Sequence, residues 1–205
     1  GSTTIKIAFE RTSKQHVRIS QNTVKDSVLV EKMVINKQNF KSAKDVDGFV
    51  PQASGLYCIR IKNVHLLPEP FGTILLERGH DILYIGIASE NLYNRFLNQE
   101  LRAKGHGTFF RSMGAVLGYK PPKGSLIEKR NKKNYKFSKT DELKIIGWIN
   151  ENLMVNWVES AGDLDSLETS LIVKYLPLLN LSKNPAALQI LSYLRKECVE
   201  IANRN

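Results

Sequence analysis

Three short stretches of this chain are rich in aliphatic and aromatic residues, and this pattern predicts β-strands. The stretches cover residues 56–61, 82–87 and 154–158. The first two follow one another along the chain, and neighbours of this kind most simply pair antiparallel. Such pairing brings Tyr57 of the first strand close to Tyr84 of the second.

Apolar residues at helical spacing predict helices between and after these strands. One helix is expected to begin at Ser89 as its N-cap and to run to about residue 104, because Gly105 stops it. Arg95 lies at the edge of its apolar side and can reach back over the sheet. Other helices are expected over residues 108–119, 141–150 and 185–202, and from Asp165 onward, while Pro68 and Pro70 indicate a loop between the first two strands.

The composition favours a globular protein with a polyanionic partner. The 205 residues are 42% hydrophobic, which is typical of a globular chain. No apolar run approaches the roughly 20 residues of a membrane helix, so no membrane partner is expected. The two cysteines, Cys58 and Cys198, fit a reduced, cytoplasmic protein. Thirty Lys and Arg against twenty Asp and Glu give a net charge of +10, which favours a polyanionic partner, nucleic acid first.

Basic residues are concentrated between residues 120 and 139. We expect them to follow a nucleic-acid backbone, although a solvated, partly disordered loop is the alternative. Tyr135 and Phe137 lie among the lysines and are expected to stack on bases or to wedge into a groove. Arg111 either approaches a phosphate or forms a structural ion pair. The basic residues assigned to nucleic-acid binding are Arg111, Lys120, Lys123, Lys129, Arg130, Lys132 and Lys133.

Glu168 is a carboxylate at a helix position where an apolar side chain is expected. On a helix it falls within the apolar stripe rather than opposite it. A carboxylate that faces the core needs a cation or a hydrogen-bond partner. The alternative is a capping box, with Asp165 as the N-cap and Glu168 three residues later. The stripe consists of Leu164, Leu167, Leu171, Ile172 and Tyr175.

Five elements occur in a fixed order along the chain: Gly55-Leu56-Tyr57, Tyr84-Ile85-Gly86, Arg95, Glu168 and Asn180. In this order they resemble the GIY-YIG nuclease superfamily. The resemblance implies an α+β fold in which helices flank a small three-stranded antiparallel sheet. It covers residues 54–185 as a nuclease domain, leaving residues 1–53 as an N-terminal extension packed on the core, in which residues 3–9 alternate like a strand. The basic segment 120–139 is then an insertion, and residues 186–205 form a C-terminal helix.

The resemblance also implies roles for these residues. Tyr57 or Tyr84 activates a water molecule, Arg95 holds the phosphate, and Asn180 orders the site. Glu168 is the metal ligand, with Mg²⁺ as the cofactor and Mn²⁺ as a substitute. A tyrosine has an ordinary pKa near 10, so it acts as a base only where cations lower that value.

Two positions depart from the family pattern. Many relatives have a lysine where this chain has Ile87, and a histidine or tyrosine where it has Gln99. The main hypothesis remains a divalent-metal-dependent endodeoxyribonuclease of restriction type that acts on DNA, sequence-specifically, and as a homodimer where both strands are cut. A catalytically inactive DNA-binding module of the same fold is one alternative. A ribonuclease or nuclease toxin is another.

Overall fold

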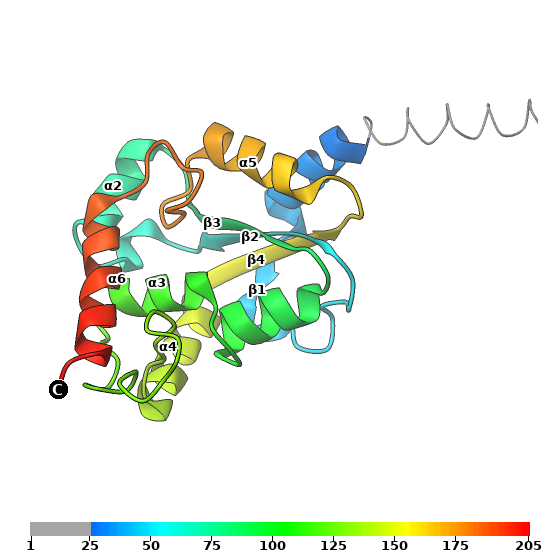
Figure 1. Cartoon of the computed structure of the whole chain (residues 1–205). Coiled ribbons are helices and arrows are strands. Elements are labelled where there is room, and N and C mark those ends of the chain that lie inside the picture. The colour runs from blue at the N-terminus through cyan, green and yellow to red at the C-terminus, as the bar shows by residue number, and fades with distance from the viewer. Residues whose placement is uncertain (1–25) are drawn as a thin grey trace, which may run out of the picture.

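The computed structural model describes residues 26–205 and contains an antiparallel sheet. The strand order is β1-β4-β2-β3, and each neighbouring pair is antiparallel (Figure 1). The three predicted strands are confirmed, but the sheet has four strands rather than three. The additional strand, β1, comes from the N-terminal extension and is too short to produce an alternating pattern. The strands are β1 (Lys41–Ser42), β2 (Gly55–Ile61), β3 (Ile82–Ala88) and β4 (Leu153–Glu159).

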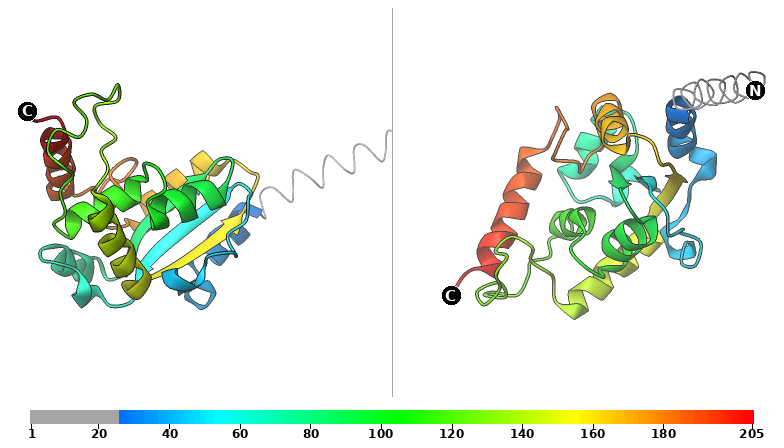
Figure 2. Two further views of the ribbon diagram at one scale, coloured as in Figure 1. Left: turned by 90° about the horizontal axis from the view of Figure 1, so that it is seen from below. Right: turned by 45° about the vertical axis from the view of Figure 1, so that its right-hand side comes forward.

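Helices cover both faces of the sheet, which confirms the α+β class (Figures 1 and 2). The face that carries Tyr57 packs against η4 (Tyr93–Leu101), α3 (Thr108–Val116) and α4 (Lys139–Asn152). The opposite face, with Leu56 and Cys58, packs against the helix over residues 26–35 and α5 (Leu164–Tyr175). Helix α6 (Gln189–Ala202) packs against α3, and short helical turns occupy Lys37–Asn39, Ala43–Asp45 and Val64–Leu66.

Two glycines allow the central strands to pack closely. A Cβ atom on Gly86 would lie 2.4 Å from the Cζ and Oη atoms of Tyr57, so the tyrosine ring covers this glycine. A Cβ on Gly55 would lie 2.2 Å from the Val158 carbonyl oxygen. Since real Cβ atoms do not come this close, a side chain at either position would displace its neighbour. Both glycines are therefore steric requirements of the sheet.

The segment after α5 covers the outer edge of β3. The N–H of Leu178 donates to the Ile82 carbonyl (3.1 Å), and that of Leu179 donates to the Leu83 carbonyl (2.8 Å). These bonds use backbone groups that an edge strand would otherwise leave unpaired. They also bring the residues that follow α5 beside Tyr84.

Some boundaries and caps differ from the sequence predictions. The expected loop around Pro68 and Pro70 leads into a helix, α2 (Phe71–Arg78). Ser89 is not an N-cap; instead, the Asn91 side chain accepts a hydrogen bond from the Asn94 N–H (3.2 Å). The helices predicted over residues 108–119, 141–150 and 185–202 are α3, α4 and α6. Two of their six ends coincide with the prediction, and the other four lie two to four residues from it. Residues 3–9 lie outside the described residues.

Asp163, not Asp165, is the N-cap of α5. Its side chain accepts a hydrogen bond from the Ser166 N–H (3.2 Å). The capping-box interpretation of Glu168 is therefore wrong, because the position three residues after the N-cap is Ser166, and Glu168 lies two residues further along the helix. Its place in the apolar stripe needs another explanation.

Candidate active site

Tyr57 and Tyr84 lie side by side on β2 and β3, with ring centroids 6.2 Å apart. Both are buried, at 1% and 8% exposure. Phe96 of η4 stacks on Tyr57 at 4.7 Å, and Phe109 of α3 packs on Tyr84 at 5.6 Å. Aromatic contacts on both sides hold the two phenols in fixed positions.

Arg95 reaches from η4 to the Tyr57 ring. Its side chain is half-buried, and it lies close enough to the Tyr57 phenol for each group to shift the pKa of the other. Its Nη1 also donates to Oε1 of Gln99 at 3.2 Å. Gln99, one of the two departures from the family pattern, therefore orients Arg95. The other, Ile87, lies on β3 and packs with the opposite face of the sheet.

Glu168 projects from α5 and is 15% exposed. Its Oε1 accepts a hydrogen bond from Lys183 Nζ at 2.9 Å, and Lys183 also contacts Asp165 at 2.6 Å. The Glu168 charge contributes to the raised pKa of Tyr84, after burial and the Glu100 charge, so the carboxylate acts electrostatically on this phenol. Lys183 explains how a carboxylate is tolerated in the apolar stripe. It engages one oxygen and leaves Oε2 without a partner among the described residues.

Asn180 is fixed to the backbone of β3. Its Oδ1 accepts a hydrogen bond from the Ile85 N–H at 3.0 Å, and its Nδ2 donates to the Ile85 carbonyl at 2.9 Å. The side chain is only 5% exposed. Asn180 therefore completes the edge pairing beside Tyr84 and holds the end of the α5 segment in place. Both polar groups of its side chain are occupied.

Glu100 is a buried carboxylate of this site that the sequence analysis missed. Its Oε2 accepts a hydrogen bond from the Phe109 N–H at 2.9 Å, while Oε1 is buried without a partner among the described residues. Burial raises its pKa to about 7, which Arg95 and the Phe109 N–H oppose. An α-helix would place Gln99 one turn after Arg95, whereas η4 is a π-helix with hydrogen bonds between residues five apart. Glu100, five residues after Arg95, is close enough for the arginine charge to lower its pKa.

Both tyrosines are held in the neutral form. Burial raises the pKa of Tyr57 well above its ordinary value, and the Glu100 charge raises it further. The same two causes raise the pKa of Tyr84, and Arg95 lowers both without offsetting them. Either phenol therefore needs further positive charge nearby before it can act as a base at neutral pH.

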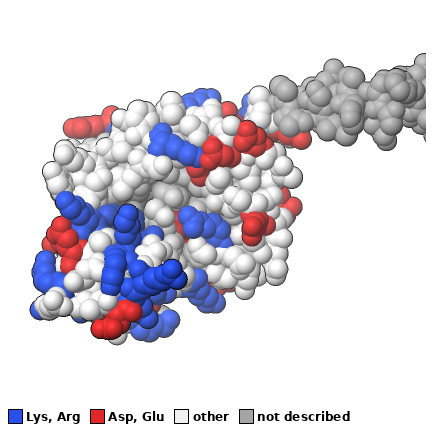
Figure 3. All heavy atoms as spheres, viewed as in Figure 1, with Lys and Arg blue, Asp and Glu red and all other residues white. Residues whose placement is uncertain are grey.

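The basic residues predicted to bind nucleic acid have different environments. Lys120 is paired with Glu197 at 2.9 Å, and Lys132 donates to the Leu126 carbonyl at 3.1 Å. Arg111 is buried at 9% exposure. Lys123, Lys129, Arg130 and Lys133 are exposed. Figure 3 shows Lys and Arg side chains gathered at the lower left of this face, where Figure 1 places α6 and the chain before α4.

The prediction that Tyr135 and Phe137 contact bases is wrong. Tyr135 is 0% and Phe137 4% exposed, and both belong to the main core. The segment is also attached to the end of α6, where the Leu126 N–H donates to the Ala202 carbonyl at 2.7 Å. Aromatic residues within the basic run anchor it to the domain and leave its lysines outside.

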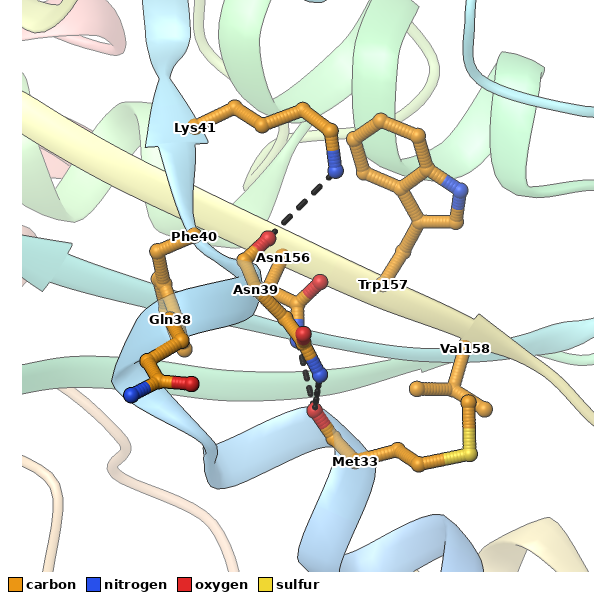
Figure 4. A pocket seen from close by; sticks show the side chains of 8 residues that line it. All are labelled: Met33, Gln38, Asn39, Phe40, Lys41, Asn156, Trp157 and Val158. Atoms are coloured by element: carbon orange, nitrogen blue, oxygen red, sulfur yellow. Dashed lines mark hydrogen bonds between the residues drawn. The ribbon is translucent and has the colours of Figure 1, made fainter.

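A separate pocket lies at the β4 edge of the sheet, away from β3 (Figure 4). It encloses about 350 Å³ and includes Trp157, with Lys41 Nζ 5.0 Å from the indole centroid. Asn39 and Asn156 both donate hydrogen bonds to the Met33 carbonyl, at 3.1 and 2.9 Å. These amides therefore join the helix over residues 26–35 to the sheet, and the pocket is not part of the tyrosine site.

Two further findings concern metals and membranes. Within residues 26–205, no three His, Cys, Asp or Glu side chains are grouped so that they could hold a metal ion. Each helix in the same range is too short or too polar to cross a bilayer.

The comparisons with known proteins identify one family. Residues 55–197 match the family described as the GIY-YIG catalytic domain. Neither the search of curated proteins nor the search of solved structures finds a significant match. The matched region contains both tyrosines, Arg95, Glu168 and Asn180, and it extends into α6. This chain therefore belongs to the GIY-YIG family, whose catalytic domain is of the nuclease type.

Proposed function

We propose that this chain is a divalent-metal-dependent endonuclease that hydrolyses phosphodiester bonds in DNA. The observation that carries the proposal is the convergence of groups from distant parts of the chain. The rings of Tyr57 and Tyr84 lie 6.2 Å apart, with Arg95 against the first phenol and Glu168 beside the second. This set combines proton-transfer groups, a fixed cation and an oxygen ligand.

Arg95 holds the phosphate. Its planar guanidinium presents several donors that match phosphate oxygens, and the bond to Gln99 limits its motion. Negative charge increases on the phosphate oxygens as water attacks phosphorus. A positioned guanidinium stabilises that charge most effectively in a site that excludes water.

Tyr57 or Tyr84 accepts the proton of the attacking water. Because burial raises the pKa of both phenols, this role depends on positive charge that arrives with the substrate complex. The Arg95 charge lowers the pKa of both phenols, whereas Tyr84 is the more exposed and is the one whose pKa the Glu168 charge raises. Both phenols remain candidates for the base.

Glu168 is the proposed ligand for Mg²⁺, with Mn²⁺ as a substitute. Members of the family generally depend on a divalent metal. The residues fit such an ion, because Oε2 of Glu168 is available and Mg²⁺ commonly takes one or two carboxylates together with waters and phosphate oxygens. When bound, the ion supplies a Lewis acid beside the reacting phosphate. Asn180 positions the segment that carries Lys183 and is not itself a ligand.

DNA is the proposed substrate because the chain carries a net charge of +10 and presents exposed lysines on the segment before α4. This segment and the N-terminal extension would supply target recognition, as in a restriction enzyme. One site cuts one strand, so cutting of both strands would require a homodimer.

Substitution of Arg95 tests this assignment. Arg95→Ala should reduce the cleavage of a labelled duplex in Mg²⁺ by at least about 100-fold, a loss typical of removing one transition-state donor. Arg95→Lys should restore only part of the rate because it lacks the planar donors. Lys144→Ala, an exposed cation on α4, is the matched control. Unchanged cleavage by folded Arg95→Ala would contradict the proposal, and a parallel RNA substrate would reveal a ribonuclease.

An inactive DNA-binding module is the second candidate. It is favoured by the raised pKa values of both tyrosines and by the ion pair between Glu168 and Lys183. Binding of DNA that EDTA leaves unchanged, with no cleavage in Mg²⁺ or Mn²⁺, would identify such a module.

A further inference from the structure

Arg111 and Arg195 come together on one aromatic ring, away from the tyrosine pair. Arg111 belongs to α3 and Arg195 to α6. Their guanidinium carbons lie 5.6 and 5.8 Å from the centroid of Tyr135. Two helices that are distant in the sequence therefore direct two positive charges to the same place.

Arg111 makes only neutral and mostly long hydrogen bonds. It donates to Oδ1 of Asn134 at 3.1 Å and to the carbonyls of Gly107, Lys133 and His106 at 3.4, 3.4 and 3.5 Å. It has no carboxylate within salt-bridge distance in the described part of the chain. The structural ion pair considered for this residue is therefore not formed.

Arg195 also has no acidic partner at salt-bridge distance within residues 26–205. Its Nη1 donates to the Thr108 carbonyl at 3.1 Å and to Oγ of Ser112 at 2.7 Å. Its Nε is buried and has no partner among the described residues. Glu100 is close enough for both guanidinium charges to lower its pKa, but it does not contact either arginine. The pair thus retains an excess of positive charge.

Holding these cations together is unfavourable unless an anion joins them. Burial lowers the pKa of Arg111, and the neighbouring Arg195 lowers it further. Charged groups removed from water normally have an opposite charge as a partner. A phosphate is a suitable partner, because arginine donors match its oxygens.

A pocket of about 380 Å³ opens beside this pair. It has room for a phosphate diester, and two exposed lysines belong to its lining. The lining residues are Arg111, Lys133, Asn134, Arg195, Lys196 and Val199.

We propose that Arg111 and Arg195 form a subsite for a phosphate of the bound nucleic-acid strand other than the phosphate that is cleaved. This inference rests on the proposed nuclease function and adds a second point of attachment for the substrate. α3 connects the two sites, because Phe109 packs on Tyr84 and Arg111 follows two residues later. Exposed Lys133 and Lys196 extend the subsite toward the solvent. This suits a nucleic-acid strand, because the strand continues beyond the phosphate that is bound.

The first test measures equilibrium binding of a labelled DNA duplex, in EDTA, to the full chain carrying Glu168→Gln. Adding Arg195→Gln should weaken binding about tenfold and reduce the slope of log affinity against log salt by about one, the change expected for one lost phosphate contact. Lys144→Gln, which removes an exposed charge from α4, should weaken binding and change the slope less. Equal affinity and slope with and without Arg195→Gln would overturn the inference.

A second measurement does not depend on DNA binding. Inorganic phosphate should raise the melting temperature of the wild-type chain, and Arg195→Gln should lose most of this increase. Arg195→Lys retains the charge and should keep the salt slope, so a folding defect can be distinguished from a lost contact. If the wild type cleaves DNA but phosphate stabilises it no more than Arg195→Gln, the subsite is absent while the nuclease function stands. If phosphate binds at Arg195 but no nucleic acid is bound, the nuclease function fails instead.

Discussion

The buried carboxylate of Glu100 makes the stability of the domain depend on pH. Burial raises its pKa from 4.5 to about 7. The folded protein therefore holds this proton more tightly than the unfolded chain does. Its stabilising contribution is complete below pH 4.5 and is lost as the pH rises through 7. At about 1.4 kcal/mol per pKa unit, the loss is at most about 3.5 kcal/mol.

Glu100→Gln should remove most of this pH dependence. Glutamine can still accept the hydrogen bond from the Phe109 N–H, but it does not ionise. Urea unfolding at pH 5 and pH 8 should therefore show a smaller difference for Glu100→Gln than for the wild type. Glu200→Gln, an exposed position on α6, should retain the wild-type difference. The same pH dependence in all three proteins would exclude Glu100 as its source.

Gly86 supports the tyrosine pair by having no side chain. The added Cβ of Gly86→Ala would lie 2.4 Å from Tyr57 atoms and must displace the phenol. We expect a loss of stability of about 1–3 kcal/mol from this overpacking, together with slower cleavage. Gly147→Ala on α4 is the control, because no atom beyond its chain neighbours and its own helix backbone lies within 4 Å of its Cβ. It should be neutral or stabilising by up to about 1 kcal/mol in thermal unfolding. Equal effects at the two glycines would contradict the close packing at Gly86.

Individual elements differ in how well the sequence predicts them. The strands that carry Tyr57 and Tyr84 are recognisable because short runs of aliphatic and aromatic residues are typical of strands buried on both faces, and antiparallel pairing follows from their proximity in the chain. The helix α2 is not predicted, because Pro68 and Pro70 just before it indicate a loop. β1 has two residues and no pattern of its own.

The candidate site is predictable only in part, because some of its residues have no local sequence signal. Motif order identifies Tyr57, Arg95 and Glu168, but a regular α-helical spacing cannot identify Glu100, because η4 is a π-helix. The pairing of Arg111 with Arg195 depends on the packing of α3 against α6, which no local pattern encodes.

The loop after α5 is expected to control access of metal to Glu168. Lys183 engages Oε1 of Glu168 and also contacts Asp165. Lys183→Met removes a competing cation and leaves both carboxylates unneutralised, so Mn²⁺ should bind several-fold more tightly in calorimetry. Lys174 lies on the same helix as Glu168 and pairs with Glu31 of the helix over residues 26–35. Lys174→Met breaks that ion pair and should leave the Mn²⁺ affinity unchanged. Weaker Mn²⁺ binding in Lys183→Met would show that Lys183 supports the metal site rather than competing with it.

Across the whole molecule, the sheet order places the tyrosine pair between two groups of charged side chains. β2 and β3 lie at the end of the order β1-β4-β2-β3, where α5 and the segment after it contribute Glu168 and Lys183. α3 and α6 contribute Arg111 and Arg195, next to the basic segment before α4 (Figures 1 and 3). A nucleic-acid strand that follows the basic surface would thereby reach the tyrosine pair.

The most direct test is Mg²⁺-dependent conversion of supercoiled plasmid by the wild type and by Glu168→Gln. We expect the wild type to nick the plasmid in Mg²⁺ and to stop when EDTA is added. Glu168→Gln should remain folded and bind DNA but produce no nicked product. Glu200→Gln should cleave like the wild type. Cleavage by Glu168→Gln at the wild-type rate, or by the wild type in EDTA, would contradict a metal-dependent reaction at Glu168.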